Sequence, residues 1–239
     1  MRLDKFFSSQ SLASRKEVRA LIKAGRIMVN GQPALSPEQP VEPARDSIRL
    51  DGAEIAYQEH IYLMMNKPQG VVSATEDGHC RTVLDLVPPE LWRKGLFPAG
   101  RLDKDTVGFV LLTDDGDFAH RILSPKRHVP KTYEAVISAP VDSADIAAFE
   151  AGLPLADGTV CRPADLSVLK VGEQPLVRIV LHEGKYHQIK RMFETRGKRV
   201  LWLKRTMIGG LALDEALPAG GCRAILHKEL LKILESQKG

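Results

Sequence analysis

The sequence has little that would build a disulfide framework or a membrane anchor. It holds three cysteines, Cys80, Cys161 and Cys222, which lie far apart and form no C-x-x-C pair. A zinc ribbon or a disulfide scaffold is therefore not expected. No apolar run approaches the about 20 residues that a bilayer-spanning helix needs. Residues 1–7 also lack the apolar stretch of a secretory signal, so we expect a cytoplasmic protein.

The motifs that hold phosphates, metals or an activated serine are absent as well. The sequence contains no G-x-x-x-x-G-K-[ST] loop, no H-E-x-x-H pair and no G-x-S-x-G elbow. Its seven histidines do not combine with cysteines at a metal-ligand spacing. We therefore expect any chemistry of this chain to need neither a metal nor a nucleotide cofactor.

The charge of the chain is mild in total but unevenly placed. The 239 residues carry a net charge of +4, whereas residues 1–31 hold seven bases against two acids, and residues 185–205 hold eight bases against one acid. Two basic clusters on a nearly neutral chain indicate a polyanion held at two places. Solvated surface charge is the alternative, and the scarcity of compensating acids in both clusters makes it the weaker one.

The first 58 residues predict a small basic module. Ser14 and Glu17 form a capping box ahead of a helix over 15–23. In that helix Arg15, Arg19 and Lys23 are spaced four apart, so they share one face. A strand over 27–29, an Asn-Gly turn at 30–31 and a strand over 48–50 follow. We place the domain boundary near residue 59, giving domains 1–58 and 59–239.

The remaining sequence alternates between strand-like and helix-like segments. Strands are expected over 61–65, 109–113, 132–138, 164–169, 176–181 and 200–204. Helices are expected over 116–123, 143–151, 187–195 and 227–236. Because helices appear only after several strands and many connections look like hairpins, the pattern favours an α+β fold with an antiparallel or mixed sheet.

The densest group of polar residues spans 100–108, between a turn and an apolar strand. Asp103 stands there beside Arg101 and Lys104, and neighbouring positive charge favours its ionised form. An ionised carboxylate can act as a nucleophile or a base. Taken alone, these residues fit an Asx turn with surface ion pairs somewhat better than catalysis.

Two further groups could contribute to a site. In residues 182–193, the segment from Lys185 to His187 is expected at a helix start, with Lys190 and Arg191 facing outward. In residues 131–133, an exposed Tyr133 could stack on a nucleobase. An ordinary charged helix and a packed strand tyrosine are the respective alternatives, and the residues alone favour both.

These motifs, taken in order, resemble those of the pseudouridine synthases. The matching strings are G-R-L-D-x-x-T-x-G at 100–108, K-x-Y at 131–133 and E-G-K-Y-H-Q-I-K-R-M at 183–192. The last string most resembles the RsuA-type branch, which acts on small-subunit ribosomal RNA. The sequence departs from the usual pattern at Phe109, where leucine is common, and at Lys185, where sister branches have arginine. Residues 1–31 resemble the small αL-type RNA-binding module of a small-subunit ribosomal protein and of tyrosyl-tRNA synthetases.

The resemblance implies a mixed, largely antiparallel sheet that carries a uridine isomerase. It implies that Asp103 is the essential carboxylate, that Lys185 is its counter-ion and that Tyr133 stacks on the uracil. Arg101 would occupy the space that the flipped uridine vacates, and the expected pocket packing and RNA-binding residues are Leu102, Ile189, Arg2, Arg15, Lys16, Arg19, Lys23, Arg26, Lys190 and Arg191.

Several functions stay open at this stage. The expected partner is ribosomal RNA or a subunit assembly intermediate, bound by a monomer without cofactor, metal or membrane. One alternative is a pseudouridine synthase for large-subunit ribosomal RNA, and another is a non-catalytic RNA-binding assembly factor. A third is a glycosidase, which would need a second acid about 5–9.5 Å from Asp103.

Overall fold

The protein is described by a computed structural model that covers residues 1–124 and 129–234. Contacts between residues divide it into two compact units. Unit 1 comprises Met1–Ile61 together with Pro89–Leu96, and unit 2 comprises Tyr62–Pro88 and the chain from Phe97 onward. The segment Pro89–Leu96 thus groups with the N-terminal unit, a division that was not predicted from the sequence.

Unit 1 combines two helices with a small antiparallel sheet. Helix α1 spans Leu3–Ser9 and α2 spans Arg15–Lys23. The sheet order is β2-β1-β3-β4, with bounds Gln32–Pro33, Ile27–Val29, Ile48–Leu50 and Ala53–Glu54. The predicted helix over 15–23 and strands over 27–29 and 48–50 are confirmed.

The local chemistry of unit 1 explains these bounds. The Glu17 amide donates to the Ser14 hydroxyl at 3.3 Å, and the Ser14 amide donates to the Glu17 carboxylate at 2.7 Å, which completes the capping box. Leu3, Phe6 and Val18 are fully or almost fully buried and join the two helices to the sheet. The apolar stripe of α2 therefore faces the core, and its basic face is left in solvent.

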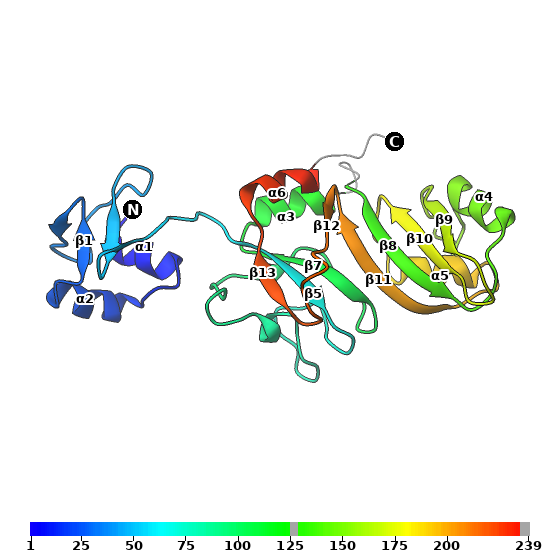
Figure 1. Cartoon of the computed structure of the whole chain (residues 1–239), viewed down its shortest axis with the longest axis horizontal. Coiled ribbons are helices and arrows are strands. Elements are labelled where there is room, and N and C mark those ends of the chain that lie inside the picture. Colours follow the sequence, from blue (N-terminus) through cyan, green and yellow to red (C-terminus); the bar gives the residue numbers. More distant parts are fainter. Residues whose placement is uncertain (125–128, 235–239) are drawn as a thin grey trace. The chain divides into compact units, whose positions relative to one another are not determined.

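Unit 2 is built on a nine-stranded sheet whose main path runs β13-β5-β7-β11-β8-β10-β9 (Figure 1). Strands β7 and β11 are parallel, and the other pairings are antiparallel. The predicted α+β class with a mixed, largely antiparallel sheet is confirmed. The strands are β5 Tyr62–Lys67, β6 Phe97–Pro98, β7 Val107–Thr113, β8 Lys131–Ile137, β9 Asp165–Lys170, β10 Leu176–Leu181, β11 Val200–Ile208, β12 Leu211–Ala212 and β13 Cys222–Ala224.

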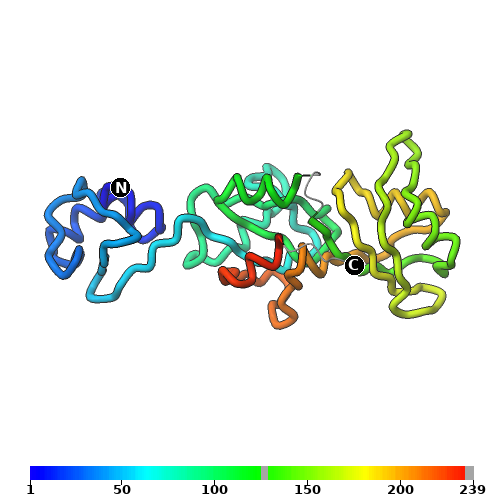
Figure 2. The backbone as a smooth tube through the Cα atoms, turned by 90° about the horizontal axis from the view of Figure 1, so that it is seen from above, coloured from blue at the N-terminus to red at the C-terminus, as the bar shows by residue number. Residues whose placement is uncertain are grey.

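The helices of unit 2 pack near the two ends of this sheet. They are the 3₁₀ turn η1 at Leu84–Leu86, α3 Gly116–Leu123, α4 Ser143–Ala151, α5 Gln188–Glu194 and α6 His227–Leu234. The predicted helices are confirmed, and the last two residues of the one expected over 227–236 lie outside the described residues. Figures 1 and 2 show α6 near one end of the unit and the segment around residues 150–190 at the other.

Apolar contacts anchor the helices at both ends. Phe118 of α3 and Ile233 of α6 belong to one buried cluster with Phe109 of β7. At the other end the rings of Phe149 in α4 and Phe193 in α5 lie 4.9 Å apart. None of the helices in the described part of the chain has the length and apolar character to cross a bilayer.

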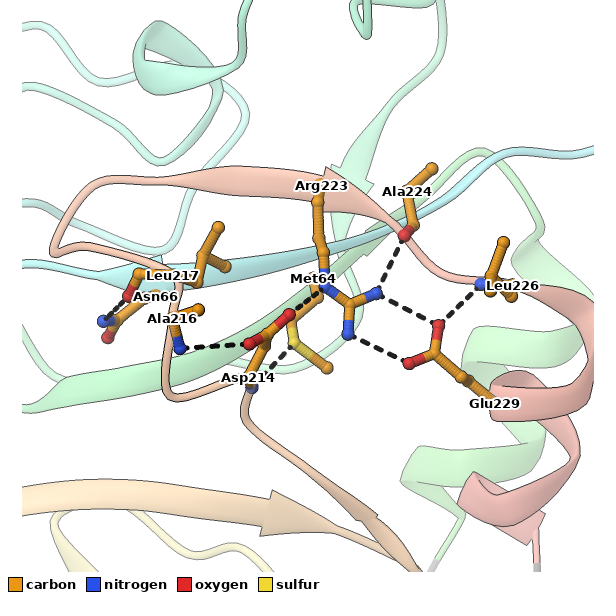
Figure 3. Close-up of polar contacts among 9 residues, drawn as sticks. All are labelled: Met64, Asn66, Asp214, Ala216, Leu217, Arg223, Ala224, Leu226 and Glu229. Atoms are coloured by element: carbon orange, nitrogen blue, oxygen red, sulfur yellow. Dashed lines mark hydrogen bonds and ion pairs between the residues drawn. The ribbon is translucent and has the colours of Figure 1, made fainter.

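A guanidinium holds the C-terminal edge of the sheet together (Figure 3). Arg223 of β13 donates two hydrogen bonds to the Glu229 carboxylate of α6, at 2.9 and 3.0 Å, and one to Asp214 at 2.7 Å. Glu229 also accepts the Leu226 amide at 2.9 Å. A three-residue strand and the start of the last helix are thus fixed to each other by charged hydrogen bonds.

Candidate active site

The strand β7 and the loop before it position Asp103. The Leu102 amide donates to the buried Ser73 hydroxyl at 3.0 Å, and that hydroxyl donates to the Leu102 carbonyl at 3.1 Å. The Thr106 amide donates to the Asp103 carbonyl at 3.1 Å and closes a turn. Gly108 follows with a φ of +101°, and a Cβ there would lie 2.3 Å from the Arg205 carbonyl oxygen. Glycine is therefore required where β7 meets β11.

A cavity of about 740 Å³ opens beside Asp103. It is enclosed by the loop before β7, by β8, by β11 and by the segment from the end of β10 into α5. The residues that the sequence analysis assigned to catalysis or pocket packing all line it, namely Arg101, Leu102, Asp103, Tyr133, Lys185 and Ile189. Residues from four separate stretches of sequence are thus brought to one concave surface, which is the usual form of a ligand site.

Lys190 of α5 is the charged partner of Asp103. Its ammonium lies 3.2 Å from one Asp103 oxygen, and the His187 imidazole lies 3.6 Å from the other. The Asp105 carboxylate is 2.6 Å from the same ammonium. Burial lowers the pKa of Lys190, but its bonds to Asp105 and Asp103 outweigh burial and hold that pKa above the ordinary value. The Asp103 carboxylate therefore faces an ammonium group that stays protonated at neutral pH.

The predicted pairing of Lys185 with Asp103 is wrong. The Lys185 ammonium donates to the Val160 carbonyl at 2.5 Å and lies 3.1 Å from the Glu183 carboxylate. Because α5 begins only at Gln188, Lys185 stays in the preceding loop, while Lys190 in the first turns of the helix points back to Asp103. The expectation that Lys190 faces outward is wrong for the same reason.

The loop that carries Lys185 is held by polar side chains. The Lys185 amide donates to the Gln188 side chain at 3.0 Å, and that side chain donates to Glu183 at 2.8 Å. Burial raises the pKa of Glu183, but the bonds from the Arg162 amide and from Lys185 outweigh it and lower the pKa overall. His187 adopts a left-handed conformation with a φ of +48°, a strained state for a residue with a side chain.

The walls of the cavity combine apolar packing with exposed cations. Tyr133, Leu102 and Ile189 are each less than a tenth exposed. Arg101 and Lys104 are exposed and line the same cavity. An apolar wall with a phenol and nearby cations suits a planar, polar ring such as a nucleobase.

Three cations at or near the cavity had no role predicted from the sequence: Lys67 and Arg205 are buried, and Lys131 is half-buried. Lys67 donates to the Thr106 carbonyl at 2.8 Å, and burial lowers its pKa to about 8. Burial, with the nearby Arg205, likewise lowers the pKa of Lys131 to about 8. Arg205 is 3% exposed and donates to the Phe109 carbonyl at 2.7 Å. The K-x-Y motif drew attention to Lys131, but nothing in the sequence marked Lys67 or Arg205 as buried.

The candidate RNA-binding residues of unit 1 differ in how closely acidic side chains pair with them. Arg15, Lys16, Arg19 and Lys23 are exposed on α2. Of these, Arg15 lies 4.0 Å from Asp4. Two further residues are engaged more closely by acids of unit 1: Arg2 pairs with Asp4 at 2.8 Å and Glu38 at 3.1 Å, and Arg26 pairs with Asp51 at 2.6 Å.

The second basic cluster is largely neutralised inside unit 2. Arg191 pairs with Asp157 at 2.5 Å, Lys190 pairs as described, and Asp145 binds both Arg196, at 2.9 Å, and Lys198. Acids distant in sequence thus pair with several bases of this cluster, and the contact of Lys190 and Arg191 with RNA stays a prediction.

No cluster of three or more histidine, cysteine or acidic side chains that could hold a metal ion is found within residues 1–124 and 129–234. The cavity is thus described by organic side chains alone.

Family models and individual proteins similar to this sequence point to the same enzyme family. Residues 61–195 match the RNA pseudouridylate synthase family, and residues 1–46 match the S4 domain. An uncharacterised RNA pseudouridine synthase of Bacillus subtilis (strain 168) is 46% identical over 99% of this chain and all of its own length. The ribosomal small subunit pseudouridine synthase A of Escherichia coli (strain K12) is 38% identical over 98% of this chain and all of its own.

One solved structure resembles the whole chain. A crystal structure of a pseudouridylate synthase covers 98% of this chain and 99% of its own, with 35% identity and a TM-score of 0.68. The likeness therefore extends through both units and is not confined to the motifs around the cavity.

Proposed function

We propose, for a chain that belongs to the family of RNA pseudouridylate synthases, that it converts a uridine of small-subunit ribosomal RNA into pseudouridine. The observation that carries the proposal is Asp103, charge-paired with Lys190 at the edge of a cavity whose wall includes Tyr133. The subunit assignment is supported by the relatives named ribosomal small subunit pseudouridine synthase A. The resemblance of the string at 183–192 to the RsuA-type branch agrees with it. We place the enzyme in the cytoplasm, where it acts as a monomer on ribosomal RNA or an assembling subunit.

The reaction breaks the bond between nitrogen 1 of uracil and the anomeric carbon of the ribose. The uracil then rotates, carbon 5 bonds to the same sugar carbon, and the proton on carbon 5 is lost while nitrogen 1 gains one. No atom is added and no oxidation occurs. The uracil must first leave its stack, which costs a few kcal/mol, so groups of the protein must offset that cost.

Each residue at the cavity has a proposed part in this sequence. Asp103 either attacks the anomeric carbon or removes a sugar proton to give a glycal. Lys190 takes the counter-ion role that the resemblance implied for Lys185, because its ammonium lies 3.2 Å from the Asp103 carboxylate. Tyr133 stacks on the uracil and accepts the proton of carbon 5.

The remaining side chains shape the pocket around the base. Leu102 and Ile189 are buried and offer apolar surface to the uracil faces and edges. Arg101 is exposed at the cavity and is the candidate for filling the space left in the RNA. The exposed basic residues of α2 supply sequence-independent attraction to RNA phosphates.

Pseudouridine mapping tests the proposal. The purified protein is incubated with unmodified small-subunit and large-subunit ribosomal RNA transcripts and with partly assembled small subunits, and the products are mapped. One new pseudouridine in small-subunit RNA is expected, in the transcript or in the particle. Product only in large-subunit RNA would refute the subunit assignment. Binding without any product would favour the assembly-factor alternative, and release of free uracil would favour a glycosidase.

A further inference from the structure

Tyr186 is the most exposed aromatic side chain in the described part of the chain, with 73% of its surface in solvent. It stacks on the His187 imidazole, with ring centroids 3.8 Å apart and planes inclined by 18°. Both rings line the cavity beside Asp103. One face of the Tyr186 ring is therefore covered by His187, and most of the rest is open to a ligand.

The Tyr186 ring is held in place before any ligand arrives. The Arg191 guanidinium donates to the Tyr186 carbonyl at 3.4 Å and pairs with Asp157 at 2.5 Å. His187, whose left-handed backbone turns the chain into α5, stacks directly beneath the ring. A ring fixed in this way loses little conformational entropy on binding, and an aromatic side chain has few torsions to lose.

The position of the ring relative to Asp103 indicates what it contacts. His187 contacts both groups: its ring stacks on Tyr186, and its Nε2 lies 3.6 Å from an Asp103 oxygen. A single imidazole thus separates Tyr186 from the group that acts on the ribose. When the target uridine leaves the RNA stack, each neighbouring base loses a stacking partner. Tyr186 lines the cavity and is exposed, so its open face is available to such a neighbour.

We propose that Tyr186, supported by His187, is a stacking platform for a nucleobase directly adjacent to the target uridine. This inference rests on the proposed function and adds a substrate contact to it. Because every base has a π face, stacking of this kind is tolerant of sequence. Tyr186 therefore contributes affinity for unpaired RNA at the target and selects little between bases.

The test is a double-mutant cycle between the ring and the base. Once the modified uridine is mapped, RNA fragments are made with both neighbours present, with the 5′ neighbour abasic, or with the 3′ neighbour abasic. Binding is measured in an Asp103→Asn background, which keeps the substrate unconverted. The protein variants are Tyr186→Ala, Tyr186→Phe and, as a matched exposed aromatic away from the cavity, Trp202→Ala.

We expect Tyr186→Ala to weaken binding of the intact fragment roughly 5- to 150-fold, the range for one stacked base. Tyr186→Phe should restore most of that affinity, because the ring and not the hydroxyl carries the contact. On one of the two abasic fragments Tyr186→Ala should cost nothing further. With Asp103 intact, Tyr186→Ala should raise KM and leave kcat within about twofold, the pattern of lost uniform binding.

Other results would overturn the inference. Equal losses on all three fragments, no loss on any, or a Phe variant as weak as the Ala variant would each exclude the stacking contact, as would an equal effect of Trp202→Ala. Its failure is distinguishable from failure of the proposed function. If the wild-type protein forms no pseudouridine, both fall together; if it does and the cycle shows no coupling, only the platform is excluded.

Discussion

Asp103 lines the cavity, the backbone at Leu102 and Asp103 is held by hydrogen bonds with Ser73 and Thr106, and the Asp103 carboxylate lies 3.2 Å from the Lys190 ammonium. The proposed reaction requires a charged carboxylate at this position. We expect Asp103→Asn to abolish pseudouridine formation, because the amide can neither attack the sugar nor remove a proton. The substitution keeps the size of the side chain, so RNA affinity should stay within a few-fold of wild type. Mapping and a binding assay on the same transcript check both parts. Even modest turnover by this variant would contradict the assignment.

The choice of counter-ion gives a second prediction at this scale. Lys190→Met should lower kcat by at least about 100-fold, because it leaves the Asp103 and Asp105 carboxylates without the cation between them. Lys185→Met should cost less, since that ammonium is engaged by Glu183 and the Val160 carbonyl. Single-turnover rates measured on both variants compare them directly. A larger loss at Lys185 than at Lys190 would restore the pairing that the sequence suggested.

Some residues of the site could be predicted from the sequence, and others could not. The motif around Asp103 could be recognised from the string alone, because the residue types and spacing are specific. The partner could not, since Lys185 and Lys190 are both basic residues of one motif and only the start of α5 decides which of them points back. The burial of Lys67 could not be predicted for a different reason. A lysine that ends a strand is ordinarily solvated, and Lys67 is buried because a loop distant in sequence packs over it.

Whether a helix or strand could be predicted depended on its length and on the capping or turn residues at its ends. The helices α2, α3 and α4 have the predicted bounds, and a side-chain cap marks the start of each. In α2 and α3 an apolar stripe continues the helix from its cap. Strands β2, β4, β6, β12 and β13 were missed, since two or three residues carry little periodicity. The three-residue strands β1 and β3 were found, and an Asn-Gly turn follows β1. Such short strands exist because an existing sheet edge supplies their hydrogen bonds, which is information held elsewhere in the chain.

The link between β13 and α6 predicts a pH-dependent stability. The bond from Arg223 lowers the pKa of Glu229 in the folded protein. A carboxyl with a lowered folded pKa contributes stability above its usual value near 4.5, and that contribution is lost as the pH falls through the folded value. We expect Glu229→Gln to reduce the free energy of unfolding by ~1–2 kcal/mol at pH 7. Urea unfolding at pH 7 measures this difference.

The same measurement at low pH provides the control for that prediction. As the Glu229 carboxyl of the wild-type protein becomes protonated, the gap between wild type and Glu229→Gln should shrink. Glu42→Gln offers a matched substitution, because Glu42 makes an exposed ion pair with Arg45, and exposed pairs contribute little. A gap that stays constant from pH 7 down to pH 3 would show that the charge of Glu229 is not what fixes α6.

The net charge of the whole molecule does not show which basic side chains are paired with acids and which are exposed. The two basic clusters look alike in the sequence, yet one is largely paired with acids that fold against it and the other keeps an exposed basic face on α2. Sequence composition could locate both clusters but could not pair them, because Asp105, Asp145 and Asp157 are distant along the chain. Long-range attraction to RNA is therefore expected to depend mainly on the basic face of unit 1.

That difference predicts how RNA binding responds to salt. Each phosphate contact releases counter-ions, so removing one contact should reduce the slope of log affinity against log salt by about 0.7–0.9. We expect this reduction, with weaker binding, for Lys23→Ala on the exposed face of α2. Arg45→Ala is the matched control in the same unit, since its charge already pairs with Glu42 at 3.3 Å. Titrations of ribosomal RNA between about 50 and 200 mM salt measure both slopes. If the slope of Lys23→Ala equals that of wild type, the α2 face does not contact RNA phosphates, and the attraction must come from the cavity side of unit 2.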